Sequence, residues 1–179
     1  MNVRGHSRRR VWSDLAVGAA TVVLYIILAA VFFICLSLNN IFLRHPNRTT
    51  ATTLLTFGVM ITAMHSVYGG FDVGRKKSRP VISAMIASTV LTDIVAYVQM
   101  EIMNVNDNRN DHLILFGTDL LYLLLCLVIQ IVIVIIFVRI GNTVYFHFNP
   151  PRSVLLITGS QEQEASLRAK IGRYKLQWR

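Results

Sequence analysis

The chain has 179 residues, of which 54% are hydrophobic and 15% charged, and its mean hydropathy is +0.52. A water-soluble domain of this length needs a larger polar share to cover its surface. The formal net charge of +9 is compatible with nucleic acid or with anionic lipid headgroups. Because the basic residues flank apolar runs, we predict a membrane surface as the partner and no nucleic acid.

Four apolar runs are each long enough to cross a bilayer. A hydrocarbon core ~30 Å thick requires about 20 helical residues. The runs are Leu15–Leu38, Ala51–Phe71, Val81–Met103 and Leu113–Val138. The first exceeds the ~7–15 apolar residues of a signal peptide, so we expect it to be retained. Since no run alternates as a barrel strand does, we predict an all-α membrane protein, an antiparallel bundle of four transmembrane helices.

The positions of Lys and Arg predict the orientation, because cytoplasmic loops are enriched in these residues. Of the 18, the segments before 15, between 71 and 81, and after 138 carry 4, 4 and 7, and the other two loops carry 2 and 1. We predict that both termini and the middle loop face the cytoplasm, with residues 1–14 as a basic N-terminal segment. The residues that most clearly set this asymmetry are Arg8, Arg9, Arg10, Arg75, Lys76, Lys77 and Arg79.

The residues after the fourth run differ in character. A Pro-Pro break at 150–151 precedes a short apolar stretch ending at Gly159, and residues 161–174 have a helical pattern. Strand, glycine turn and helix are how a Rossmann-like unit begins, but one strand and one helix cannot bury a core. We expect residues 149–179 to be the cytoplasmic start of such a domain, in a chain truncated before the rest of it. No phosphate-binding glycine pattern surrounds Gly159, so we predict no cofactor.

Polar residues within the apolar runs are the candidate functional residues, because burying them in lipid is costly. They are Asp93, His65, Asp119, Gln99 and Gln130. Two interpretations stay open. Asp93 and His65 form an ion or proton path or contact a lipid headgroup, or they are polar groups that hold the helices together, with a carboxyl kept neutral by burial. Glu101, close to a helix end, is expected to reach water.

Other motifs are scarce. Cys35 and Cys126 lie inside apolar runs and are expected to act as small packing residues. Asn47-Arg48-Thr49 fits the glycosylation pattern, which we interpret as a chance match. The sequence contains no metal-ligand spacing, nucleophile elbow or phosphate loop, so we predict no metal site and no catalytic residue in this chain.

The segment from Val67 to Lys77 carries a family resemblance. With Tyr68, Gly69, Gly70, Phe71 and Gly74, it resembles the end of the second membrane helix and the following loop of bacterial exopolysaccharide sugar transferases, the polytopic polyprenyl glycosylphosphotransferases. The third run adds Ser83 and the spacing Asp93…Tyr97-x-Gln99, and the Pro-Pro-Arg tail is similar to the start of that family's cytoplasmic domain. The resemblance covers most of the chain.

The resemblance implies a function. The family transfers a sugar-1-phosphate from a nucleotide sugar to a polyprenyl phosphate, with its chemistry in a later domain, so this chain would be the N-terminal membrane region in a bacterial plasma membrane. Polyprenyl phosphate is then a possible lipid partner, and homo-oligomerisation stays open. The alternatives are a stand-alone transporter or lipid-carrier flippase that uses Asp93 and His65, and a purely structural membrane subunit.

Overall fold

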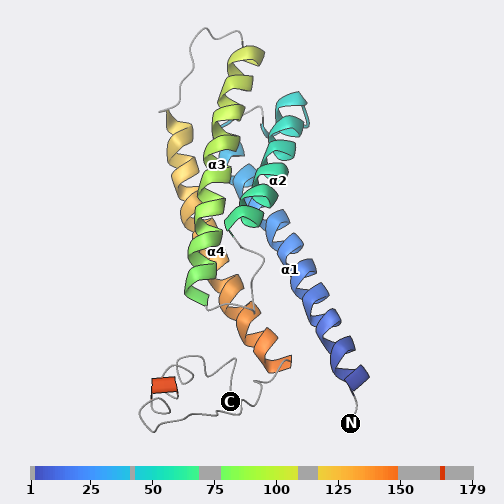
Figure 1. The fold of residues 1–179 in the computed structure, drawn as a ribbon. Coiled ribbons are helices and arrows are strands. Elements are labelled where there is room, and N and C mark those ends of the chain that lie inside the picture. The colour runs from blue at the N-terminus through green and yellow to red at the C-terminus, as the bar shows by residue number, and fades with distance from the viewer. Residues whose placement is uncertain (1–2, 41–42, 69–77, 109–116, 149–165, 168–179) are drawn as a thin grey trace.

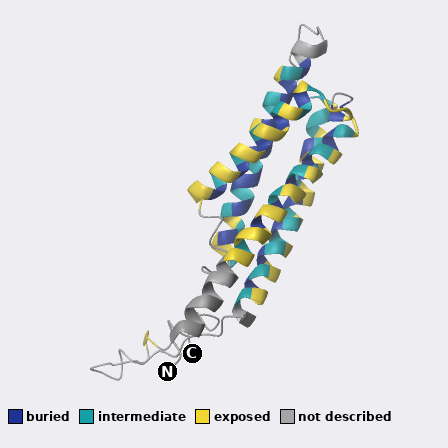
Figure 2. Ribbon diagram, turned by 90° about the vertical axis from the view of Figure 1, so that its right-hand side faces the viewer, coloured by how far each residue is buried: buried dark blue, intermediate teal, exposed yellow. Residues whose placement is uncertain are grey.

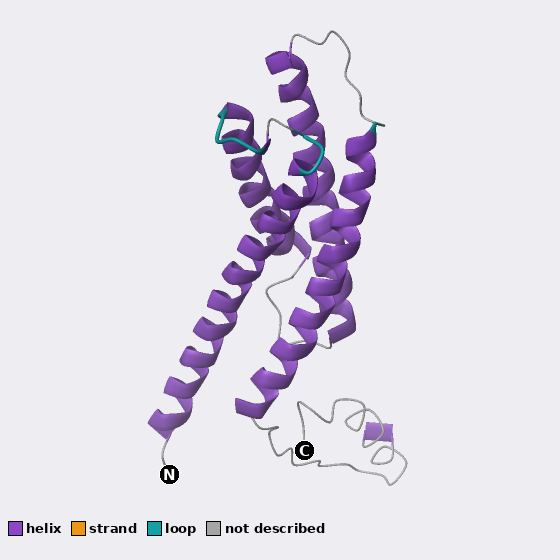
Figure 3. Ribbon diagram, turned by 180° about the vertical axis from the view of Figure 1, so that it is seen from behind, coloured by secondary structure: helices purple, strands orange, loops and turns teal. Residues whose placement is uncertain are grey.

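The computed structural model describes residues 3–40, 43–68, 78–108, 117–148 and 166–167, and for 3–14, 105–108 and 146–148 the backbone alone. Within these residues the chain forms four long helices and no strand (Figure 3). They are α1 (Val3–Ser37), α2 (Arg48–Tyr68), α3 (Ser78–Asn108) and α4 (Thr118–Phe148). Of the predicted strand and helix in the tail, only Ser166 and Leu167 are described, in helical conformation; the rest lies outside the described residues.

Each helix contains a stretch long and apolar enough to cross a membrane. These stretches are Leu15–Ser37, Arg48–Tyr68, Ser78–Asn104 and Thr118–Tyr145. The predicted all-α class with four membrane-length helices is therefore confirmed, and the chain is a multi-pass membrane protein. The helices extend beyond some of the apolar runs: α4 continues past the exposed Arg139, because a long cationic side chain can leave an apolar environment without interrupting the helix.

The loop between α1 and α2 satisfies both helix ends through side chains. The side chain of Asn47 caps α2, since its Oδ1 accepts hydrogen bonds from the Thr50 backbone N–H at 2.8 Å and from the Thr50 hydroxyl at 3.0 Å. Arg44 donates to the carbonyl oxygens of Ser37 at 2.8 Å and Leu38 at 2.9 Å, which end α1. Asn47 thus has a structural role in the segment that matches the glycosylation pattern.

Figure 1 shows how the helices are arranged. Neighbouring helices run in opposite directions, so α1 begins and α4 ends at the same end of the bundle. The main contacts join α2 to α3, α1 to α4 and α3 to α4, whereas α1 and α2 touch much less. The end at which α1 ends and α2 and α4 begin is called the α1–α2 loop end below.

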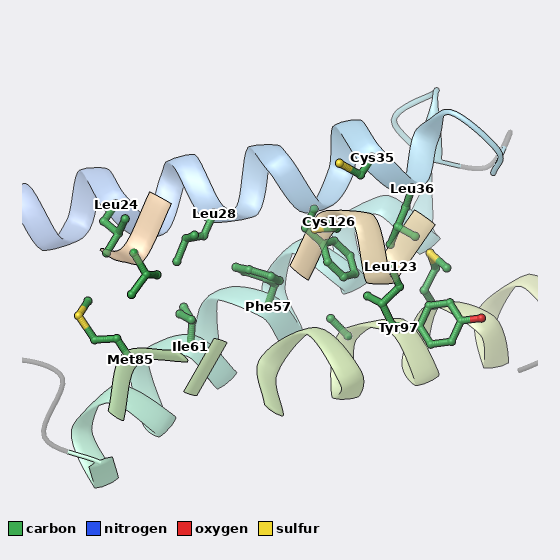
Figure 4. Packing of buried hydrophobic residues seen from close by; sticks show 14 of the residues in the cluster. Leu24, Leu28, Cys35, Leu36, Phe57, Ile61, Met85, Tyr97, Leu123 and Cys126 are labelled. Atoms are coloured by element: carbon green, nitrogen blue, oxygen red, sulfur yellow. The ribbon is translucent and has the colours of Figure 1, made fainter. Parts of the chain in front are cut away.

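The interior is closely packed and the outside is apolar. Core side chains from all four helices meet between the ribbons, among them Leu28, Phe57, Met85 and Cys126 (Figure 4). Large apolar side chains are also exposed along the helices, among them Leu55 on α2 at 69%. Figure 2 shows that exposed positions occur along the length of the bundle. Soluble monomers rarely expose an apolar surface of this extent, so the surroundings of these faces are lipid.

Candidate functional site

The polar residues predicted from the sequence fall mainly into three places in the interior, each at a contact between helices. In the middle of the bundle, Asp93 on α3 and Gln130 on α4 are both fully buried. Gln130 Nε2 donates to the carbonyl oxygen of Leu28 on α1 at 3.0 Å and, at the longer distance of 3.4 Å, to Asp93 Oδ1. One amide therefore links three helices.

Proton placement decides what this central group can do. Among the described residues, Asp93 Oδ2, Gln130 Oε1 and Thr92 Oγ1 have no hydrogen-bond partner. An ionised carboxylate here would carry a charge inside the bilayer with one long hydrogen bond to offset it. A protonated Asp93 gains a donor that Gln130 Oε1 can accept, which removes both the charge and an unsatisfied acceptor. The geometry therefore favours a neutral acid that holds helices together, and it places an exchangeable proton at the centre of the bundle.

His65 on α2 occupies the second place and is also fully buried. Its Nδ1 lies 2.9 Å from the Ile61 carbonyl oxygen, which can only accept, so Nδ1 carries the proton. The ring packs on Tyr25 of α1, with centroids 5.0 Å apart and a tilt of 52°. In the structure His65 contacts Tyr25, and Asp93 contacts Gln130. The two residues that were predicted to form one ion or proton path therefore have different partners.

The third place is at the α1–α2 loop end. Asp119, in the first turn of α4, accepts hydrogen bonds from Asn39 Nδ2 on Oδ1 at 2.6 Å and from Asn40 Nδ2 on Oδ2 at 3.3 Å. The carboxyl group of Glu101 on α3 lies close to that of Asp119. These four residues, Asn39, Asn40, Glu101 and Asp119, are called the loop-end cluster.

Glu101 corrects one expectation. It was expected to reach water, yet only 7% of its surface is exposed. The reason is that α3 continues to Asn108, so Glu101 lies within the helix and faces the first turn of α4. Two ionised carboxylates about 4 Å apart repel by about 4 kcal/mol near a protein surface. A proton shared by Glu101 and Asp119 would remove this repulsion.

The remaining predicted residues are placed as follows. Gln99 is half-buried, and its Oε1 has no partner among the described residues. Tyr68 and Arg79 are exposed. The other motif and topology residues lie outside the described part of the chain or have no described side chain, namely Gly69, Gly70, Phe71, Gly74, Arg75, Lys76, Lys77, Arg8, Arg9 and Arg10.

The two cysteines are buried and adjacent. Cys35 on α1 and Cys126 on α4 are free thiols that lie close to each other, and Figure 4 shows them side by side in the core. Their surroundings are those of small packing residues. In the described part of the chain, no three side chains of His, Cys, Asp or Glu gather where they could hold a metal ion.

Sequence reasoning did not single out Tyr25, Asn39 or Asn40, and it set Glu101 aside as a residue that reaches water. Asn39 and Asn40 follow an apolar run and look like ordinary loop residues, and Tyr25 looks like one more apolar member of its run. Their significance comes from contacts between residues far apart in the chain, since Asn39 and Asp119 are 80 positions apart. The one signal in the sequence that could have indicated Asn39, Asn40 and Glu101 is that polar side chains stand near the ends of the apolar runs.

Comparison of the chain with models of protein families, with curated proteins and with solved structures finds no significant match.

Proposed function

We propose that this chain is the membrane region of a bacterial sugar transferase that joins a sugar-1-phosphate to a polyprenyl phosphate during exopolysaccharide synthesis. The observation that carries the proposal is the segment from Val67 to Lys77, which follows the second membrane helix and resembles that family. The four membrane-length helices are the architecture that such a region requires. In this proposal, the chain anchors the enzyme and positions it in the membrane, while the transfer chemistry belongs to a later domain.

The interior contacts support an anchoring role. Asp93 and Tyr97, which belong to the family-like spacing on α3, are both buried in the bundle. Asp93 is hydrogen-bonded to Gln130, which also binds the backbone of α1. Residues used in this way hold helices in register, and none of them is placed on a surface where a nucleotide sugar would bind.

The orientation within the proposal follows from the basic residues. The middle loop carries Arg75, Lys76, Lys77 and Arg79, so it faces the cytoplasm together with both termini. Anionic headgroups of the inner leaflet then lie next to these side chains, at a gain of about 1 kcal/mol for each charge near the surface. The family-like segment would thereby be at the cytoplasmic face, where nucleotide sugars are made.

Sugar transfer can be tested in membranes from cells that carry or lack the intact gene. Incubation with labelled nucleotide sugars should yield a gene-dependent labelled lipid that releases its sugar in mild acid, as a polyprenyl diphosphate sugar does. Addition of UMP should reverse the label if the nucleotide is a uridine diphosphate sugar. If none of the nucleotide sugars gives a gene-dependent labelled lipid, the proposal is wrong.

The central acid favours a second candidate, a stand-alone transporter or lipid-carrier flippase. Asp93 places an exchangeable proton at the centre of the bundle, and Thr92 Oγ1 beside it has no partner among the described residues. A transporter predicts that Asp93→Asn abolishes flux in vesicles reconstituted with the purified chain, while Glu101→Gln at the loop end does not. Equal flux in Asp93→Asn and in the wild type would remove this candidate and leave an anchoring or purely structural role.

A further inference from the structure

The buried polar groups of α3 are distributed unevenly along the helix. Five of its side chains have a buried oxygen with no hydrogen-bond partner among the described residues, and all five stand between the middle of the helix and the α1–α2 loop end. They are Thr92, Asp93, Gln99, Glu101 and Asn104. Buried polar atoms of this kind bind ordered water, so hydration is favoured along this half of α3.

The other half of α3 has no such oxygen within its described residues. Ser88 and Thr89 each donate to the carbonyl oxygen four positions earlier at 2.9 Å, and Ser83 donates to the carbonyl oxygen three positions earlier at 3.0 Å. Hydroxyl groups bonded in this way are satisfied without water. The change from bonded to unbonded hydroxyl groups comes at Thr92, directly before Asp93.

Three titratable side chains stand at intervals of four residues on the loop-end half of α3. They are Asp93, Tyr97 and Glu101, all buried. Side chains at this interval share a face of a helix, with Cβ atoms about 5–6 Å apart. Figure 4 shows the Tyr97 hydroxyl directed toward the α1–α2 loop end. Because a phenol both donates and accepts hydrogen bonds, it can join water on its two sides.

This polar face reaches the surface at the loop-end cluster. Asn40 Nδ2 lies 4.0 Å from Met100 Sδ and donates to Asp119 Oδ2 at 3.3 Å. The turn of α3 that carries Glu101 therefore lies beside the first turn of α4. Asn39, which binds the other oxygen of Asp119, is exposed, so water reaches the cluster from outside.

Toward the opposite end of the bundle, the corresponding positions are apolar. On α3 they are Met85 and Val81, and on α4 they are Val134 and Val138; each is at most 1% exposed. Figure 4 shows Met85 at the other end of the core from Tyr97. Closely packed apolar side chains offer no partner to water, so the hydrated face ends at the middle of the bundle.

The titratable groups on the other helices do not extend this face. Cys35 on α1 and Cys126 on α4 are free thiols, which are weak hydrogen-bond partners. His65 on α2 packs on Tyr25 toward the opposite end of the bundle. The next buried position of α2 toward the loop end is Ile61, which is apolar and lies between His65 and the middle of the helix.

We propose that the hydrated face of α3 connects Asp93 with the α1–α2 loop end alone, so that its proton exchanges with water on one side of the membrane only. Tyr97 and the oxygens of Glu101 and Asn104 hold the water. One proton leaves Asp93 along these hydrogen bonds as another arrives from solvent, so no net charge moves. The inference rests on neither proposed function, since a proton can be exchanged without sugar transfer and without net transport.

The exchange can be followed by infrared spectroscopy of the full chain in vesicles moved from ordinary to heavy water. A protonated carboxyl group has a C=O stretching band that shifts on deuteration, and Asp93→Asn identifies the band of Asp93. Tyr97→Phe and Glu101→Leu should each slow this shift about tenfold, because each removes a hydrogen-bonding group from the path. Glu101→Gln keeps a polar group there and should exchange as the wild type does. Thr89→Val, in the opposite half of α3, is the matched control and should also exchange as the wild type does.

Two further measurements support the test. Backbone amide exchange in the same spectra shows whether a variant keeps its fold, and Asn104→Leu replaces Tyr97→Phe if that variant unfolds. Vesicles with the wild type should keep a pH gradient as long as vesicles without protein do, because the path is closed on one side.

Four outcomes would overturn the proposal. They are the absence of a protonated Asp93 band, equal exchange rates in Tyr97→Phe and Thr89→Val, equally slow exchange in Glu101→Gln and Glu101→Leu, and rapid loss of the pH gradient in wild-type vesicles. Sugar transfer and substrate flux are measured separately, so either proposed function can fail while the exchange is observed.

Discussion

Replacement of Gln130 by leucine tests the central contact most directly. The two side chains are similar in volume, so Gln130→Leu removes hydrogen bonds without creating a large cavity. It removes the bond of 3.0 Å to Leu28 O and the bond of 3.4 Å to Asp93 Oδ1. An interhelical hydrogen bond in a membrane protein contributes ~0.6 kcal/mol on average. The Asp93 carboxyl would lose the one hydrogen-bond donor that it has among the described residues, which costs about 1–3 kcal/mol in a buried site. We expect a loss of about 2 kcal/mol in the free energy of unfolding.

The double variant Asp93→Leu/Gln130→Leu makes this prediction specific. Because it removes the carboxyl group as well, no acceptor is left unsatisfied there, so it should be more stable than Gln130→Leu alone. Unfolding in mixed micelles with increasing SDS, followed by helix content, measures the double variant and the two single variants, Asp93→Leu and Gln130→Leu. Val128→Leu, on a residue of α4 that is 60% exposed, is the matched control and should be neutral. If the losses of the two single variants simply add in the double variant, Asp93 and Gln130 do not interact and the reasoning is refuted.

Three further predictions concern the loop, the core and the orientation. Asn47→Ala should destabilise the bundle by about 1 kcal/mol because α2 loses its cap, while Asn47→Asp should not; equal unfolding midpoints would contradict the cap. Phe57→Ala should cost about 3 kcal/mol because Phe57 is buried against an aromatic ring of α1, whereas Leu55→Ala, facing lipid, should cost little; similar losses would contradict the packing. In intact cells, a membrane-impermeant thiol reagent should label Thr118→Cys but not Arg79→Cys, and the reverse pattern would invert the proposed topology.

The membrane-spanning character could be determined from the sequence alone. A helix satisfies its own backbone hydrogen bonds, so the fitness of a segment to cross lipid depends on its own length and composition and not on its neighbours. The four apolar runs therefore predict four membrane-length helices, and these are confirmed. The sequence also identifies Asp93, Gln130 and His65 as costly residues in lipid, because each stands within an otherwise apolar run.

Only the tertiary structure decides which of these residues meet. Lipid tails are as apolar as leucine, so an apolar pattern does not reveal which face of a helix lies inside the bundle. In α4, apolar side chains occur on both the lipid-facing and the buried side, as Val128 and Val134 show. The choice of Gln130 as the partner of Asp93, and the burial of Glu101 against Asp119, depend on how α3 and α4 cross. The way α3 and α4 cross depends on packing and hydrogen bonds between distant segments, so it cannot be predicted from the sequence of either helix alone.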